Sequence, residues 1–400
     1  MTAVGYPQAP QPDPGLARAA AIAASGRCAG FHFIAPRNFC WWVYIVLVGY
    51  GVLTAIAMLG QPLSVFGPAI SGAIALLLIY GLVLWWFTRT IDRYSPVPGK
   101  LIVTALMWGA FAATMTIAVH ANTALISLYA KVFGQKFAQN WAAGLSAPIT
   151  EEVAKGIGIV LLIYMAPKVI RTAFDGFIVG AFIGLGFQTL ENILYSMNVA
   201  TSEFGLNAGE LALQNALLRM VSGVSGHIVN TAIFCAGVVY LMGRPGEPRN
   251  VKRGIGLMVL PIAMHWFFNS LQALFPVPGA WFLIVLLLAV ALFVTITVMV
   301  YRLVVVREQM LLRAILAPEV TIGVLTPPEL DAIAGTAKQR RALRKSLPDH
   351  AARRRQRWVV EAASDLANAL ARSGGADTPE VAFARSEVWR VRTGMPAARL

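Results

Sequence analysis

Nine residues decide how this chain can fold: Pro148-Ile149-Thr150-Glu151-Glu152-Val153-Ala154-Lys155-Gly156. They place three ionisable side chains inside an otherwise apolar segment. An ionisable group near the middle of a bilayer costs roughly 3 kcal/mol, so it faces the interior of a helix bundle or a water-filled cavity and commonly marks a functional site. On a helix, Lys155 lies within reach of Glu151 and of Glu152. We therefore expect Lys155 to neutralise one carboxylate and to leave the other available.

The composition is that of a polytopic membrane protein. Of the 400 residues, 57% are hydrophobic and only 13% are charged, and the mean hydropathy is +0.65. Several runs approach the roughly 20 apolar residues that span a bilayer, which excludes a soluble globular protein. The net charge of +14 is typical of the basic cytoplasmic loops and tails of membrane proteins, so we expect no nucleic-acid partner.

Hydropathy predicts an all-α fold with about eight transmembrane helices. Residues 1–38 are expected to form a disordered or loosely helical N-terminus, residues 39–305 the transmembrane bundle, and residues 306–400 a basic helical tail. The candidate spans are residues 39–60, 68–87, 101–123, 141–164, 174–197, 216–242, 255–275 and 280–304.

The distribution of positive charge predicts the orientation of these spans. Lysines and arginines gather in the loops at 88–100, 165–173 and 243–254, whereas the loops at 61–67 and 276–279 carry no charge. The loop with Lys131 and Lys136 is the one exception. Because short cytoplasmic loops carry the excess of Lys and Arg, we predict a multi-pass protein of the cell membrane with both termini in the cytoplasm.

The tail has its own helical signals. Thr326-Pro327-Pro328-Glu329 predicts a helix that begins with a capping box. The segment 338–357 contains nine lysines and arginines, and it precedes an amphipathic helix at 358–372 and a last helix near 380–392. Such a basic cluster is attracted to anionic lipid at a membrane surface, although a solvated helical tail explains it equally well.

Polar side chains in four spans are expected to form one site. At about 1.5 Å per residue, they lie roughly 10–18 Å from the outer ends of their spans, and hence in one layer of the outer half of the bilayer. The two GxxxG steps of the fifth span, Gly176, Gly180 and Gly184, predict close helix contact there. The candidates are Glu151, Glu152 and Lys155 in the fourth span, Glu191 in the fifth, His227 in the sixth, and His265 and Asn269 in the seventh.

Individually, these residues have simpler explanations. Glu151 with Lys155 is readily explained as a structural ion pair, which makes Glu152 the preferred catalytic carboxylate. A single membrane histidine is often only an interhelical hydrogen bonder. A transporter or proton relay could use the same buried groups, and a non-enzymatic scaffold could bind a membrane partner through the same pocket.

Together, the motifs resemble those of the PrsW intramembrane proteases, which are related to the type II CAAX prenyl proteases. Glu151-Glu152-Val153-Ala154-Lys155 is similar to the EExxK motif, and Asp175-Gly176 with 186–192 to the second motif. His227 alone in its span and the HxxxN sequence at 265–269 match the third and fourth motifs. The resemblance covers about residues 140–275, and one departure is Glu191, where the prenyl-protease branch has a histidine.

The resemblance implies hydrolysis of peptide bonds within or beside the membrane. In the bacterial group the substrate is typically a single-span regulatory protein such as an anti-sigma factor. By matching position, the resemblance implies that Glu151 and Glu152 activate water, that Glu191, His227 and His265 surround the water or a metal, and that Asn269 is the oxyanion partner.

Two mechanisms stay open from the residues. Glu191, His227 and His265 could bind zinc, so that Glu152 takes the proton from a zinc-bound water. Alternatively, Glu151 or Glu152 activates the water together with His227 or Glu191 and without a metal, while His265 and Asn269 stabilise the oxyanion.

Overall fold

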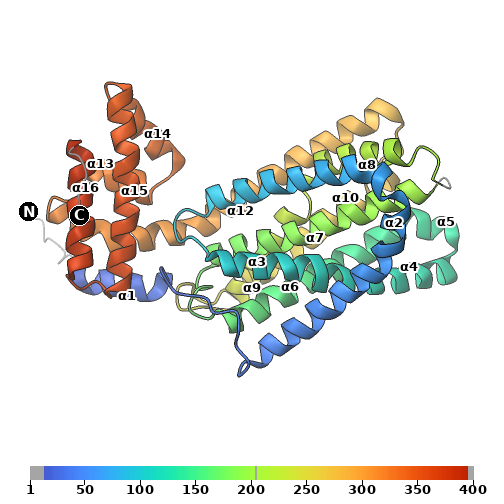
Figure 1. Cartoon of the computed structure of the whole chain (residues 1–400), viewed down its shortest axis with the longest axis horizontal. Helices are drawn as coiled ribbons and strands as arrows, with labels where there is room; N and C mark the ends of the chain where they lie inside the picture. Colours follow the sequence, from blue (N-terminus) through green and yellow to red (C-terminus); the bar gives the residue numbers. More distant parts are fainter. Residues whose placement is uncertain (1–12, 203–204, 395–400) are drawn as a thin grey trace, which may run out of the picture. The chain divides into compact units, whose positions relative to one another are not determined.

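The computed structural model describes residues 13–202 and 205–394, which fold into helices joined by short connections (Figure 1). The all-α prediction is confirmed. Residues 29–305 form one compact unit, and α1 forms a second unit with the chain from Val306 onward. The helices of the larger unit are α2 (Phe39–Ile91), α3 (Gly99–Met107), the π-helical η1 (Trp108–Ala118), α4 (Val119–Phe133), α5 (Gln135–Phe137), the π-helical η2 (Ala138–Ala142), α6 (Ala143–Met165), α7 (Ala173–Ser202), α8 (Ala208–Gly223), α9 (His227–Met242), α10 (Val251–Asn269), α11 (Leu271–Leu274) and most of α12 (Gly279–Thr321).

The first two predicted spans form one helix, α2, of 53 residues. The loop that we predicted at 61–67 is helical, so that prediction is wrong. Pro62 and Pro68 lie inside the helix, and proline bends a helix because it lacks an amide hydrogen. The ribbon of α2 bends sharply where its colour passes from dark to light blue (Figure 1). In lipid, backbone groups must bond internally, which favours a bent helix over an open loop.

Among the residues that the structure describes, five helical segments are long and apolar enough to cross a membrane, and they indicate a multi-pass membrane protein. Helices α6 and α10 coincide with the predicted spans at 141–164 and 255–275 but are not among the five. Helix α6 carries Glu151, Glu152 and Lys155, and α10 carries His265. The total of eight spans stays a prediction. The five segments are Phe39–Ile91, Gly99–Phe133, Ala173–Ser202, Ala208–Met242 and Gly279–Thr321.

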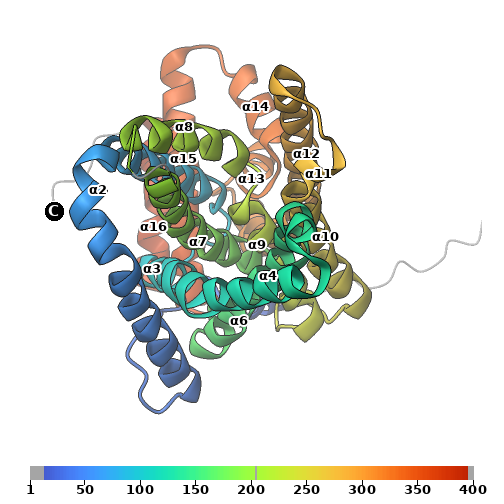
Figure 2. The same cartoon turned by 90° about the vertical axis from the view of Figure 1, so that its right-hand side faces the viewer.

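Helix α7 lies at the centre of the larger unit, with α2, α3, α6, α8 and α9 around it (Figure 2). Its glycines permit this packing, as the GxxxG pattern predicts. A Cβ atom added at Gly180 would lie 2.6 Å from the carbonyl oxygen of Thr231, and one at Gly184 would overlap the backbone of His227. The α9 backbone therefore packs directly on α7, which brings His227 to the level of Glu191.

The second unit contains α1 (Pro14–Ser25), the end of α12, α13 (Pro327–Ala334), α14 (Ala337–Ser346), α15 (His350–Arg372) and α16 (Pro379–Thr393). The predicted capping box is confirmed, because the Thr326 and Glu329 side chains each bond the other's backbone amide. The helices predicted at 358–372 and 380–392 are also present. Part of the predicted N-terminal segment, residues 1–12, lies outside the described residues. Within the rest of that segment, α1 is a regular helix in which Arg18 pairs with Glu319 at 2.7 Å.

Candidate active site

On α6, the lysine of the EExxK motif binds the second glutamate more closely than the first. The Lys155 Nζ lies 2.8 Å from Glu152 Oε1 and 3.6 Å from Glu151 Oε2. Lys155 and Glu152 are both 0% exposed, and the ammonium also lies 4.0 Å from the ring centre of Phe187. The expected pairing of Lys155 with Glu151 is therefore reversed, because the buried side of α6 carries Glu152 and Lys155 together.

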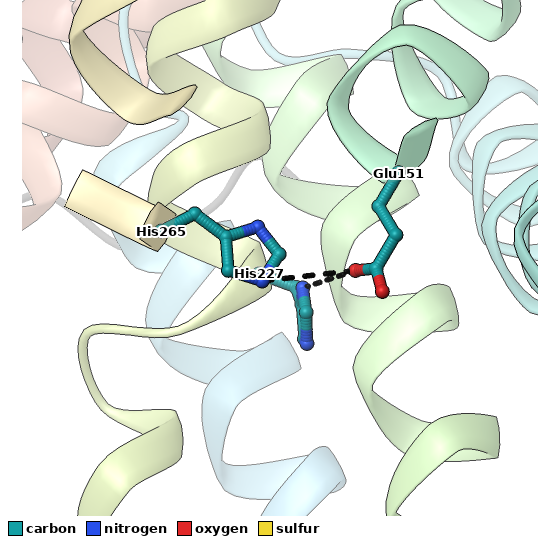
Figure 3. Close-up of side chains that lie close together, drawn as sticks. All are labelled: Glu151, His227 and His265. Atoms are coloured by element: carbon teal, nitrogen blue, oxygen red, sulfur yellow. Dashed lines mark ion pairs between the residues drawn. The ribbon is translucent and has the colours of Figure 1, made fainter. Parts of the chain in front are cut away.

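Glu151 is held by an amide that the sequence did not single out. Asn122 of α4 donates from Nδ2 to Glu151 Oε1 (3.0 Å), and Thr150 donates to Asn122 Oδ1 (2.5 Å). The other carboxylate oxygen, Glu151 Oε2, is buried without a hydrogen-bond partner among the described residues. In Figure 3 the Glu151 carboxylate points toward His227 and His265.

The tautomer of His227 follows from its two neighbours. Lys155 Nζ lies 2.9 Å from Nδ1, and an ammonium can only donate, so Nδ1 is the unprotonated nitrogen. The hydrogen is then on Nε2, which donates to Glu191 Oε2 at 2.8 Å. Glu191 thus fixes the orientation of the ring, and the Nδ1 nitrogen, which accepts from Lys155, lies 3.6 Å from Glu151 Oε2.

His265 has the corresponding arrangement with its nitrogens exchanged. Its Nδ1 lies 3.3 Å from Glu152 Oε1, and an ionised carboxylate can only accept, so Nδ1 carries the hydrogen. The unprotonated Nε2 faces Glu151 Oε2 at 3.9 Å. Each histidine therefore donates to one carboxylate and directs its other nitrogen at a third carboxylate, as metal-binding histidines commonly do.

These three side chains have the geometry of a metal site. The Glu151 Oε2 to His227 Nδ1 distance is 3.6 Å, and one ligand atom from each of Glu151, His227 and His265 lies within 4.8 Å of the others. Ligands about 2.0–2.2 Å from one tetrahedral zinc are roughly 3.3–3.6 Å apart. The three residues could hold a metal ion after a small contraction, and Glu151 Oε2, which has no hydrogen bond among the described residues, is the carboxylate oxygen nearest the two histidines.

The carboxylate of this group differs from the one that we predicted. Glu191 takes the far nitrogen of His227 and also pairs with Arg219 of α8. Arg219 Nε donates to Asn192 Oδ1 (2.7 Å), and its guanidinium lies 4.2 Å from the ring centre of Tyr195. Sequence reasoning missed Arg219, although an arginine inside the predicted span 216–242 was the same signal that identified Glu151.

The predicted sixth span is interrupted directly before its histidine. Helix α8 ends at Gly223 and α9 begins at His227. The connection contains Gly226, whose backbone angles φ −88° and ψ −137° are neither helical nor those of a regular strand. Glycines at 223 and 226 weaken the helix here, and the break brings Arg219 and His227 onto the same side of Glu191.

A cavity of about 360 Å³ opens beside this group. Its polar wall includes Glu151, Glu191, His227, His265 and Asn269, whereas Glu152 and Lys155 do not line it. All seven predicted site residues thus lie close together, but they divide into five at the cavity and two behind it.

A comparison with protein families agrees with this geometry. A family model described as PrsW family intramembrane metalloprotease matches residues 97–300, which are 204 of the 400 residues. The chain belongs to this family. It is therefore a membrane peptidase, as the resemblance of its motifs implies. The PrsW match includes every site residue named above and ends before the basic tail. Comparisons with curated proteins and with solved structures find no match.

Proposed function

We propose that this PrsW protein is an intramembrane endopeptidase that cleaves single-span membrane proteins at a metal site formed by Glu151, His227 and His265. The observation that carries the proposal is Glu151 Oε2, a buried oxygen without a hydrogen bond that faces two unprotonated imidazole nitrogens. Glu191 takes the supporting role at His227 in place of the ligand role that we predicted.

Zinc suits one carboxylate and two histidines, and it leaves a coordination position for water. When bound, such an ion polarises water and the carbonyl group of the scissile peptide bond. The protein's own side chains orient the groups, accept the proton and bind the oxyanion.

Carboxylates next to the proposed metal site orient the two histidines, and one of them accepts the proton of the attacking water. Glu191 and Glu152 hold His227 and His265 in the required tautomers. Glu191 Oε2 is occupied, but Oε1 has no hydrogen bond to a described residue, and Glu191 lines the cavity. We assign to Glu191 Oε1 the proton of the attacking water, and to the Asn269 amide a hydrogen bond to the developing oxyanion.

The shape of the cavity suits a membrane-embedded peptide. Met58, Val119 and Leu194 add apolar side chains to the lining of the same cavity, so an apolar side chain of the substrate fits beside the scissile bond. A regulatory protein with a single span, such as an anti-sigma factor, is the substrate class we propose. The proposed orientation places both termini in the cytoplasm.

A mechanism without metal is the second candidate, and one contact favours it. The Lys155 ammonium donates to His227 Nδ1 at 2.9 Å, the nitrogen that a metal would need. In that mechanism Glu151 is the base, since its Oε2 is free to accept the proton of water.

Comparison of membrane proteomes tests the activity and identifies substrates. Cells that produce the wild type are compared with cells that produce Glu151→Gln, with new protein N-termini as the readout. Glu210→Gln, at an exposed position of α8, is the matched control. We expect N-termini that appear with the wild type and the control but not with Glu151→Gln. Identical sets in all three strains would refute the proposal.

Elemental analysis separates the two mechanisms. In purified protein, one zinc per chain that is lost in His227→Ala and retained in His120→Ala supports the metal site. Full activity in protein without any metal leaves Glu151 as the base.

A further inference from the structure

The second compact unit contains a strongly basic cavity between α14 and the first turns of α15. Its volume is about 720 Å³. Helix α14 buries none of its residues, so its side chains do not contribute to the core of the unit. The segment 337–358 carries nine lysines and arginines against one acid, Asp349. Six arginines line the cavity: Arg340, Arg341, Arg344, Arg353, Arg354 and Arg357.

These six arginines have no carboxylate partner among the described residues. Arg340 donates to a backbone carbonyl (2.9 Å), and the Arg354 guanidinium lies 4.9 Å from the ring centre of Trp358. Other arginines of the same unit are paired, as Arg392 is with Glu329 at 2.7 Å. The unit therefore leaves its positive charge uncompensated at this cavity.

A second observation indicates an acceptor in the same place. The amide nitrogen of Gln356, which lines the cavity, is buried and has no hydrogen-bond partner among the described residues. An amide nitrogen can only donate, and a buried donor without an acceptor is costly. Leu343, Val360 and Trp358 supply an apolar part of the wall.

We propose that this cavity binds a phosphate-bearing ligand through its arginines. The planar guanidinium matches phosphate oxygens through paired hydrogen bonds, and several arginines around one cavity suit a multiply charged anion better than a single carboxylate. The volume lies within the range of about 300–1,000 Å³ that is typical of small-molecule sites. The head group of an anionic phospholipid and a soluble polyphosphate share this chemistry.

The proposal differs from general attraction of a basic tail to an acidic membrane. It requires side chains that line the cavity, whereas general attraction depends only on total charge. Arg353 and Arg355 separate the two, because both lie in the same basic run of α15 but Arg355 does not line the cavity. The site is also independent of the peptidase centre, so either can fail without the other.

Calorimetric titration of the full chain, purified in a neutral detergent, tests the site. The probes are inorganic tripolyphosphate and a water-soluble short-chain phosphatidic acid, each against the wild type, Arg353→Ala, Arg355→Ala and Gln356→Leu. We expect saturable binding that Arg353→Ala weakens at least about tenfold, as the loss of a charged hydrogen bond should. Gln356→Leu should weaken it severalfold, and Arg355→Ala less than about twofold.

Each outcome supports or overturns the site. Saturable binding of tripolyphosphate alone supports a soluble phosphate ligand, and tighter binding of phosphatidic acid supports a lipid head group. Equal losses in Arg353→Ala and Arg355→Ala, or no saturable binding of either probe, overturn the proposal. The thermal unfolding temperature of each variant without ligand checks that the tail remains folded.

Discussion

Replacement of Lys155 by methionine tests how the charges of α6 are balanced. Methionine has a similar length and keeps the packing, but it removes the ammonium that lies 2.8 Å from Glu152 and 3.6 Å from Glu151. Breaking a buried ion pair by removal of one partner costs about 3–5 kcal/mol, because the other charge stays buried without compensation. The loss of the contact with Phe187, 4.0 Å from the ammonium, acts in the same direction. We expect the free energy of unfolding to fall by about 3–5 kcal/mol.

A second substitution, added to Lys155→Met, shows which carboxylate Lys155 compensates. Adding Glu152→Gln to Lys155→Met removes the uncompensated charge and should recover more than half of the lost stability. Adding Glu151→Gln should recover less stability. The residue at position 151 keeps the hydrogen bond from Asn122, and Glu151 lies farther from Lys155 than Glu152 does.

Unfolding in mixed micelles, followed by tryptophan fluorescence, measures these differences, and Lys131→Met on α4 is the exposed control. A loss below about 1 kcal/mol in Lys155→Met, the usual range for an exposed pair, would refute the buried-pair reasoning. A larger recovery of stability from Glu151→Gln than from Glu152→Gln would instead support the Glu151–Lys155 pair that we predicted from the sequence.

Three further predictions concern the site, the helix packing and the connection between α2 and α3. Asn122→Leu removes the donor that orients Glu151, and we expect a loss of about 10- to 100-fold in the rate of substrate cleavage, measured in liposomes, together with a loss of about 1–3 kcal/mol of stability, because Glu151 Oε1 stays buried without its donor. Gly180→Leu forces a side chain into the backbone of Thr231, so we expect loss of about 3 kcal/mol or more of stability, measured as in the previous experiment; a tolerated leucine would contradict the direct α7–α9 contact. Burial raises the pKa of Asp92, in the connection after α2, to about 7. Because the folded chain then binds this proton more tightly than the unfolded chain, stability should decrease as the pH rises from about 4 to about 7, and Asp92→Asn should flatten that profile; an unchanged profile would contradict the raised pKa.

Local signals in the sequence predicted the capping box, the glycine face of α7 and the convergence of polar spans, but not the continuous helix α2 or the site residues Asn122 and Arg219. The threonine and glutamate of the capping box lie three residues apart, and their bonds form within one helical turn. The glycines of α7 are spaced on one helix face and predict close contact with a neighbour, which proves to be α9. Polar residues in apolar spans predicted convergence because the bilayer leaves them few other places.

Contacts that depend on a neighbouring helix could not be predicted in the same way. The sequence places Glu151 and Glu152 at equally suitable distances from Lys155, so spacing alone does not choose between them. The choice depends on α4 and α10, because Asn122 draws Glu151 toward the cavity and His265 meets Glu152 behind it. Both contacts join residues that lie far apart in the sequence, so the rules of helical spacing cannot predict them.

The same reasoning explains why the carboxylate grouped with the two histidines is Glu151 and not Glu191, which we predicted. From sequence, Glu191 and Glu151 are both carboxylates near His227, and a metal set could include either. In the structure the two lie on opposite nitrogens of one imidazole ring, at 2.8 Å from Nε2 and 3.6 Å from Nδ1. Since Lys155 can only donate to Nδ1, the protonated nitrogen is the one that faces Glu191, and a protonated nitrogen cannot bind a metal. The Lys155 contact therefore fixes the tautomer in which His227 donates to Glu191 and leaves Glu151 as the carboxylate on the other nitrogen, and replacement of Lys155 should disturb that arrangement as well as stability.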